Sequence, residues 1–259
     1  MKVAILAGGK GTRLAEETEI RPKPMVEIGG KPILWHIMRY YAHFGHREFI
    51  VALGHKSEYI KRWFYEFSSL DGDMTISTKD GVVKSYRKND SDWTIHLVET
   101  GDETQTGGRI KRLQPWLGDD EEFMLTWGDG LSNVNLDDLV NFHNQHGKLA
   151  TVTAAHPPAR YGHLEFEGNR ISRFTEKPQT AEGWINGAFF VLNRAIFDYI
   201  DGDSTQWEKE PLENLAKEAE LMAFKHPGFW QCMDTLREKY ILQTLWESGN
   251  APWKVWEEQ

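Results

Sequence analysis

The chain has 259 residues, a formal net charge of −9, and 40% hydrophobic and 27% charged residues, as in an ordinary soluble globular protein with a sizeable core. The acidic balance argues against a general nucleic-acid-binding protein, which would carry a basic face. No apolar run approaches the roughly 20 residues that span a bilayer, and a single cysteine, Cys232, excludes an internal disulfide. We therefore expect a cytoplasmic protein that binds neither membranes nor nucleic acid.

The N-terminal half of the sequence alternates between strand and helix patterns. Short apolar runs that end at turn residues indicate buried strands, and apolar positions on one face indicate helices. The predicted strands are 2–6, 49–53, 94–98 and 123–127, and the predicted helices are 32–44, 56–67 and 107–116. This order predicts an α/β fold with a doubly wound, mainly parallel, Rossmann-like sheet, helices on both faces and ligands at the carboxyl ends of the strands.

Two later regions depart from this alternation. Residues 70–93 contain short alternating pieces and turn residues, which we interpret as an inserted hairpin. After residue 150 the apolar runs are more antiparallel in character, which predicts a smaller antiparallel C-terminal subregion with helices at 194–200, 210–219 and 234–248. Because no repeat or low-complexity linker appears, we expect one domain over residues 1–259.

The first strand leads into a glycine-rich stretch, LAGGKGTRL, and a lysine follows in RPKPM. A dinucleotide fingerprint on Gly9 and Gly11 would need glycine where Leu14 stands, and no window contains the Gly-Lys-Ser/Thr of a P-loop. What remains is a turn whose backbone amides can approach an anion, with Arg13 suited to phosphate oxygens and Lys23 held between two prolines. Taken singly, each piece favours a solvated glycine turn.

Taken together, these pieces resemble the sugar nucleotidyltransferase family, whose hallmark is L-A-G-G-x-G-T-R-L followed by P-K-P-M. Further stretches match it in order and spacing: WGDG (127–130), TEKP (175–178), NGAFFVL (186–192) and FWQCMDT (229–235). The stretches RLAEETEIRPKPM, TGDETQTGGRIKRL and APWKVW are most similar to the cytidylyl branch of the family. The sequence itself assigns no role to Glu16 and Glu17 within the first of them.

The resemblance implies that CTP and α-D-glucose 1-phosphate react to give CDP-glucose and pyrophosphate, with Mg²⁺ as cofactor. Residues 1–130 would form the nucleotide-binding half, and 131–259 the sugar-binding half with the C-terminal helix. The resemblance also implies a homo-oligomer and a role in making surface sugars such as lipopolysaccharide O-antigen. We expect the 70–93 insertion and the tryptophan-rich tail, with Trp246, Trp253 and Trp256, to be the contact surfaces. Thymidylyl or uridylyl transfer, or a non-catalytic sugar-nucleotide-binding regulator, are the alternatives.

The resemblance also assigns roles to individual residues. Arg13 would hold the β- and γ-phosphates and Lys23 the reacting phosphates, while Asp129 completes the catalytic set. Asp129 and Asp234 would bind Mg²⁺, although Asp234 is equally suited to be the N-cap of the last helix. The other implied substrate contacts are the loop Leu6, Ala7, Gly8, Gly9, Lys10, Gly11 and Thr12, then Gly128, the base contacts Thr104 and Arg109, and the sugar-phosphate contacts Glu176, Lys177, Asn186 and Gly187.

Overall fold

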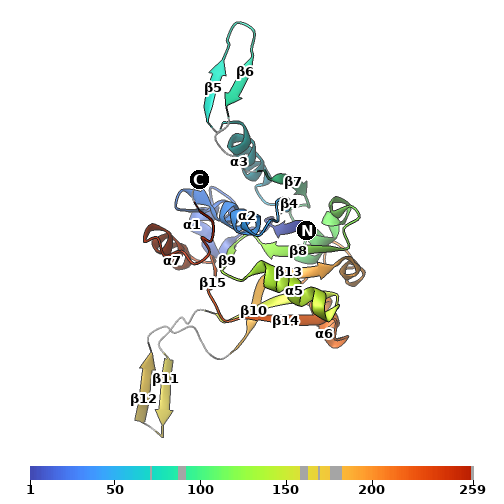
Figure 1. Ribbon diagram of the computed structural model, residues 1–259, viewed down its shortest axis with the longest axis vertical. Coiled ribbons are helices and arrows are strands. Elements are labelled where there is room, and N and C mark those ends of the chain that lie inside the picture. Colours follow the sequence, from blue (N-terminus) through green and yellow to red (C-terminus); the bar gives the residue numbers. More distant parts are fainter. Residues whose placement is uncertain (71, 87–91, 158–162, 169, 176–182, 258–259) are drawn as a thin grey trace.

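A seven-stranded sheet lies at the centre of the computed structural model, which describes residues 1–259 except 71, 87–91, 158–162, 169, 176–182 and 258–259 (Figure 1). The strand order is β14-β10-β13-β8-β1-β4-β7. The strands are β1 (Val3–Leu6), β4 (Glu48–Leu53), β7 (Thr94–Glu99), β8 (Glu122–Trp127), β10 (Ala150–Ala155), β13 (Ile185–Asn193) and β14 (Leu221–His226).

The directions of these strands confirm the predicted mainly parallel sheet. β1 pairs in parallel with β4 and β8, and β4 with β7. β13 is antiparallel to both of its neighbours, whereas β10 and β14 run parallel to each other. The antiparallel character expected after residue 150 therefore comes from one reversed strand of the main sheet and from a separate hairpin of β11 (His163–Glu167) and β12 (Arg170–Thr175).

Helices cover both faces of the sheet because its strands are apolar on both sides. In β1, Val3 and Ile5 enter one hydrophobic cluster while Ala4 and Leu6 enter the other. Residues of α2 (Ile33–His43), α3 (Ser57–Ser69), α5 (Leu136–His146) and α7 (Leu236–Glu247) belong to the first cluster. Residues of α4 (Thr106–Leu113) and α6 (Glu210–Lys217) belong to the second.

Besides the β11–β12 hairpin, three two-stranded ladders in the described part of the chain lie outside the main sheet. β2 (Glu27–Ile28) pairs with β3 (Lys31–Pro32), and β9 (Gly130–Ser132) pairs with β15 (Trp230–Cys232). Within 70–93, β5 (Asp73–Ile76) and β6 (Val83–Tyr86) form an antiparallel ladder that extends away from the body (Figure 1). None of the helices in the described part of the chain is long and apolar enough to cross a membrane.

Short helical turns complete the structure. The first, at Thr12–Leu14, leads directly into α1 (Ala15–Thr18), and another spans Lys23–Met25. Two more 3-10 turns span Gln114–Leu117 and Arg194–Tyr199, the second of them where the sequence predicts a helix. α5 has no counterpart among the predicted elements, although Asn135 caps it by accepting from the amides of Asp137 and Asp138.

The tryptophan-rich tail packs against its own chain. Trp253 is fully buried and Trp256 is 8% exposed, both within the first hydrophobic cluster. The indole of Trp246 lies so close to Gly29 that a Cβ there would be 1.9 Å from its Nε1. The expectation that this tail is a subunit contact surface is therefore wrong for Trp253 and Trp256, because the chain's own core covers them.

Candidate active site

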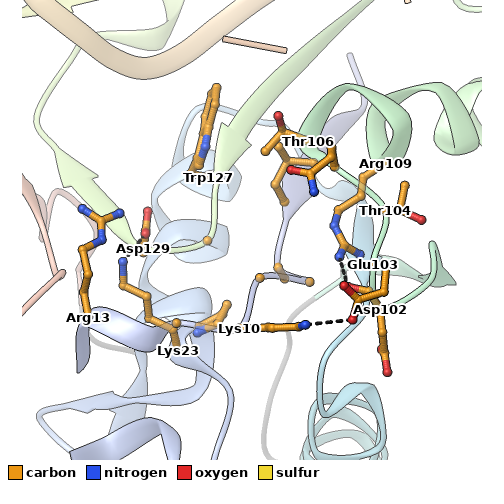
Figure 2. Close-up of a pocket in the computed structure, with 18 residues that line it drawn as sticks. Lys10, Arg13, Lys23, Asp102, Glu103, Thr104, Thr106, Arg109, Trp127 and Asp129 are labelled. Atoms are coloured by element: carbon orange, nitrogen blue, oxygen red, sulfur yellow. Dashed lines mark hydrogen bonds and ion pairs between the residues drawn. The ribbon is translucent and has the colours of Figure 1, made fainter. Parts of the chain in front are cut away.

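A cavity of about 370 Å³ opens at the carboxyl ends of the parallel strands (Figure 2). β1 supplies the glycine-rich loop, β8 supplies the WGDG turn, and the segment after β7 forms the opposite wall. The lining residues are Leu6, Ala7, Gly8, Gly9, Lys10, Gly11, Arg13, Lys23, Pro24, Asp102, Glu103, Thr104, Gln105, Thr106, Arg109, Trp127, Gly128 and Asp129. Most of the loop residues expected from the sequence therefore line a single cavity.

The glycines of the loop have different structural roles. A Cβ on Gly8 would lie 2.3 Å from the Arg109 guanidinium, so glycine at this position leaves the space that the arginine side chain occupies. Gly11 has a φ of +63°, in the left-handed region that favours glycine. A Cβ on Gly9 would meet nothing within 4 Å, so its backbone faces open space that a ligand can enter. Gly9 is thus the glycine best placed for backbone contact with an anion.

Arg109 is buried between the loop and the opposite wall. Its Nη1 donates to the Leu53 carbonyl at 3.0 Å and to Thr100 Oγ1 at 2.7 Å, and its Nη2 donates to the Asp102 carbonyl at 3.2 Å. The side chain therefore ties the ends of β4 and β7 to the loop that follows β7. Thr104, which is also largely buried, lies on this wall.

Lys23 lies between Asp129 and Asp234, the two carboxylates that the family resemblance assigns to Mg²⁺. Its Nζ donates to both Asp129 Oδ2 and Asp234 Oδ1, although these residues are 105 positions apart in the sequence. Lys23 is buried and opens the 3-10 turn Lys23–Met25, whose preceding Pro22 is extended. Prolines on either side leave this backbone little freedom, so the ammonium is directed to one point.

A short ladder brings the two carboxylates together. Gly130 of β9 pairs with Cys232 of β15, and the amide of Met233 donates to the Asp129 carbonyl at 2.9 Å. On the other side of the turn, the Gly128 amide donates to the Leu6 carbonyl at 2.9 Å. Asp129 is thereby fixed between the end of β1 and the segment that carries Asp234.

Asp234 is not the N-cap of the last helix, contrary to the alternative that the sequence left open. Thr235 caps α7 and forms a capping box with Glu238. The Glu238 carboxylate also accepts from the Asp234 amide at 2.6 Å. The Asp234 side chain is therefore directed toward the cavity residues, and Arg13 Nη1 donates to its Oδ2 at 2.5 Å.

Opposing effects set the charge of Lys23. Burial acts to lower the pKa of its ammonium, but the Asp129 and Asp234 carboxylates outweigh this effect, so the pKa is raised above its ordinary value. Lys23 is thus a permanent cation at neutral pH. By contrast, burial first and the Asp234 carboxylate second raise the pKa of the Cys232 thiol to about 12, so this thiol is neutral and a poor nucleophile.

The carboxylate pair fits a hard divalent cation that is completed by substrate oxygens. Asp129 and Asp234 approach a common point closely enough to share one ammonium. Among the described residues, no cluster of three or more His, Cys, Asp or Glu side chains could enclose a metal by itself. Two carboxylates that leave room for phosphate oxygens and water suit Mg²⁺, which rarely uses an all-protein cage.

Among the described residues predicted from the sequence, four are not part of the cavity lining: Asp234, which contacts the lining residues Arg13 and Lys23, and Thr12, Asn186 and Gly187. Thr12 belongs to the 3-10 turn beside the loop, and Asn186 and Gly187 lie at an irregularity of β13, where the Asn186 side chain accepts from the Ala188 amide at 2.8 Å. Trp230 Nε1 donates to the Gly187 carbonyl at 2.8 Å. Glu176 and Lys177 lie outside the described residues.

Two acidic lining residues had no predicted role. Asp102 and Glu103 follow the end of β7, just before the 104–109 loop expected at the base, and Lys10 Nζ contacts Glu103 at 2.7 Å across the cavity (Figure 2). The signal that could have found them is their place directly after a parallel strand, where ligands bind.

Comparisons with known proteins agree with this geometry. The Nucleotidyl transferase family model matches residues 2–231. The chain is 50% identical to glucose-1-phosphate cytidylyltransferase of Salmonella typhi and 44% identical to probable glucose-1-phosphate cytidylyltransferase of Bacillus subtilis, each over 257 residues that cover 99% of this chain and 100% of the relative. It is 33% identical to the catalytic subunit beta of mannose-1-phosphate guanylyltransferase of Danio rerio, over 89% of this chain and 60% of the relative.

Solved structures share the fold at lower identity. HddC from Yersinia pseudotuberculosis superposes with a TM-score of 0.69 at 22% identity, covering 95% of this chain and 99% of its own. UDP-glucose pyrophosphorylase complexed with UDP-glucose has a TM-score of 0.68 at 16% identity, covering 96% and 98%. These similarities place the sheet and its helices in a known architecture.

Proposed function

The chain belongs to the nucleotidyl transferase family, and we propose that its cavity binds CTP and α-D-glucose 1-phosphate and converts them into CDP-glucose and pyrophosphate. Its 50% identity to the Salmonella typhi glucose-1-phosphate cytidylyltransferase, over the full length of that protein, supports this substrate pair. The observation that carries the catalytic proposal is the position of Lys23 between Asp129 and Asp234, beside a glycine-rich loop.

The proposed reaction is an in-line displacement at phosphorus. A phosphate oxygen of glucose 1-phosphate forms a bond to the α-phosphorus of CTP. The bond from that phosphorus to the oxygen that bridges to the β-phosphorus breaks, and its electron pair leaves with pyrophosphate. The nucleophile is already an anion near neutral pH, so the site needs to overcome anion repulsion and stabilise the leaving group more than it needs a general base.

The cations of the cavity suit these two tasks. Lys23, charged and buried, would offset the repulsion between the α-phosphate and the incoming phosphate. Arg13, whose side chain is 74% exposed, is free to turn from Asp234 toward the β- and γ-phosphates, where negative charge develops. The backbone of Gly9 would add amide donors to the same phosphates.

Asp129 and Asp234 would hold Mg²⁺ beside the phosphates. When bound, this cation neutralises phosphate oxygens and offsets the charge on departing pyrophosphate. Lys23 contacts both carboxylates, so its ammonium offsets their mutual repulsion.

The base would lie against the wall that follows β7. Thr104 would supply a polar contact, and Arg109 would donate to O2 or N3 of cytosine while its other donors hold the wall in place. Arg109→Lys keeps the charge but loses the planar set of donors. We expect this variant to reduce the preference for CTP over UTP, and unchanged discrimination between the two nucleotides would exclude the assignment of Arg109 to the base.

Pyrophosphate release, measured with each of the four common NTPs and glucose 1-phosphate, tests the proposed activity. We expect turnover with CTP, dependence on Mg²⁺, and CDP-glucose as the product by mass spectrometry. No turnover with any NTP would favour a non-catalytic regulator, and a preference for dTTP or UTP would favour the related transfer reactions. The proposal extends to a homo-oligomer that supplies a precursor of surface sugars, and a monomer by light scattering would contradict the first of these points.

A further inference from the structure

A partly buried ion pair outside the cavity links the segment after the glycine-rich loop to the last helix. Lys239 Nζ on α7 contacts Glu17 Oε1 on α1, and the two side chains are only 22% and 21% exposed. Neither residue lines the cavity. Figure 1 shows α1 and α7 next to each other, although they lie at opposite ends of the sequence.

Each partner is close in sequence to a residue of the proposed active site. Glu17 lies four residues after Arg13, at the end of the same loop, and Lys239 lies five residues after Asp234, in the first turns of α7. The pair therefore joins the segment that carries the phosphate-binding cations to the segment that carries a carboxylate.

The helix α7 holds this N-terminal segment at a second point. The Gly29 amide donates to Gln243 Oε1 at 2.9 Å, and the Trp246 indole covers Gly29. Lys23 lies between these two anchors, Glu17 and Gly29. At the C-terminal end of α1, Lys56 Nζ donates to the carbonyls of Thr18 and Glu19, which fixes α1 to the start of α3.

The ion pairs of Arg13 and Lys23 with Asp234 cannot hold the two segments together during a reaction. Arg13 and Lys23 now contact Asp234, but the proposed chemistry needs these two cations on phosphate oxygens and the carboxylate on Mg²⁺. When substrates bind, these contacts between the two segments are exchanged for contacts with ligands. The Glu17–Lys239 pair is not exchanged, because neither partner faces the cavity.

We propose that Glu17 and Lys239 are positioning residues that hold the loop of Arg13 and Lys23 at a fixed distance from Asp234 while the substrates occupy the site. The inference rests on the proposed function. It gives the acidic stretch AEETEI a physical role: Glu17 faces α7 and fixes the geometry in which two cations and a carboxylate meet the triphosphate.

The test compares Glu17→Gln, Lys239→Met and the double variant with the wild type, with Lys148→Gln as a matched control. Lys148 and Glu220 form an ion pair of 2.9 Å, with side chains 39% and 26% exposed, that is not part of the cavity. Thermal unfolding, kcat, both KM values and the Mg²⁺ concentration for half-maximal activity are measured for each protein.

We expect each single variant to lower kcat and to raise the half-activating Mg²⁺ concentration, each by about tenfold, as for other residues that orient a metal ligand. The double variant should match Glu17→Gln, because both changes remove the Glu17–Lys239 contact and only Glu17→Gln also removes the 4.0 Å ion pair with Arg21. The KM for glucose 1-phosphate and all constants of Lys148→Gln should stay at wild-type values.

A folded Glu17→Gln with wild-type kcat and Mg²⁺ dependence would overturn the inference, and so would fully additive losses in the double variant. If Glu17→Gln unfolds at the assay temperature, the same measurements on Glu17→Asp decide, since this shorter carboxylate keeps the charge but weakens the contact. Turnover of the wild type tests the proposed function separately, so the two ideas fail in different experiments.

Discussion

The Lys23 ammonium and the Asp234 carboxylate meet beside Asp129 by different routes. Lys23 belongs to a segment that follows β1, and Asp129 follows β8, the parallel strand next to β1 in the sheet. Asp234 instead comes from beyond the main sheet, through the ladder of β9 and β15 and the cap of α7. Strand ends thus supply the proposed phosphate-binding side, whereas a side ladder and a helix supply the second carboxylate.

The difference between these routes indicates which part of the site is held less firmly by the main sheet. Residues at the ends of parallel strands are fixed by the hydrogen bonds of a sheet that is buried on both faces. Asp234 depends on a three-residue ladder, a capping box and contacts of α7. We therefore expect substitutions on the α7 side to disturb geometry, and substitutions at the strand ends to remove chemistry.

The largest effect is expected for Lys23→Met. This change removes a cation aimed at the reacting phosphates and leaves Asp129 and Asp234 to repel each other, so kcat should fall by about 10²–10³. Pyrophosphate release at saturating substrates measures the loss, and circular dichroism checks the fold. A loss of less than threefold would contradict the catalytic role of Lys23.

The two carboxylates allow a direct comparison of the two routes. Asp129→Asn and Asp234→Asn each remove one charge from the proposed Mg²⁺ site, and we expect each to raise the half-activating Mg²⁺ concentration by about 10- to 100-fold. Titration of activity with Mg²⁺ measures both. If Asp234→Asn alone left the Mg²⁺ dependence unchanged, the α7 side would contribute no metal ligand.

A smaller effect is expected for Gly128→Ala at the WGDG turn. An added Cβ would lie 3.0 Å from both the Leu6 carbonyl and Pro24 Cγ, so the proline next to Lys23 would have to move. We expect kcat to fall about tenfold, since small displacements of positioned groups are costly. Gly130→Ala, where a Cβ would meet nothing within 4 Å, is the matched control and should keep wild-type activity.

The smallest effect concerns the anchorage of the C-terminal tail and its dependence on pH. His36 is fully buried, and burial lowers the pKa of its imidazole to about 4. Its Nε2 donates to the Ile28 carbonyl at 2.8 Å and its Nδ1 accepts from Trp253 Nε1 at 3.4 Å, a pattern that needs the neutral ring. The folded protein therefore resists protonation at a pH where the unfolded chain, with a pKa of about 6.5, accepts it.

Consequently the free energy of unfolding should fall by about 1–2 kcal/mol from this residue as the pH drops from 7 to 5, because the unfolded state binds more protons. Urea unfolding at the two pH values measures the change. His36→Gln should flatten this dependence in part. It should not abolish it, since burial also lowers the pKa of His143 to about 4. An unchanged slope in His36→Gln would contradict the assignment.

Local patterns were sufficient for the parallel half of the fold. The strand and helix order up to residue 127 follows from apolar periodicity, and it correctly predicts a doubly wound sheet with a cavity at the carboxyl ends of its strands. The direction of β13 could not be predicted in this way. Its apolar run is compatible with either direction, and only its pairing with β8 and β10 makes it antiparallel. The burial of Trp253 and Trp256 in the chain's own core could not be predicted either, since hydrophobicity alone does not say which surface buries a side chain.

By itself, the sequence determined which residues carry charge, where glycine and proline constrain the backbone, and to which family the motifs belong. Tertiary structure alone decided that Lys23 lies between Asp129 and Asp234, that Arg109 fills the space beside Gly8, and that Glu17 pairs with Lys239. The reason is physical: composition and spacing fix local conformation, whereas contacts between residues more than 80 positions apart depend on how sheet, ladder and helix pack together.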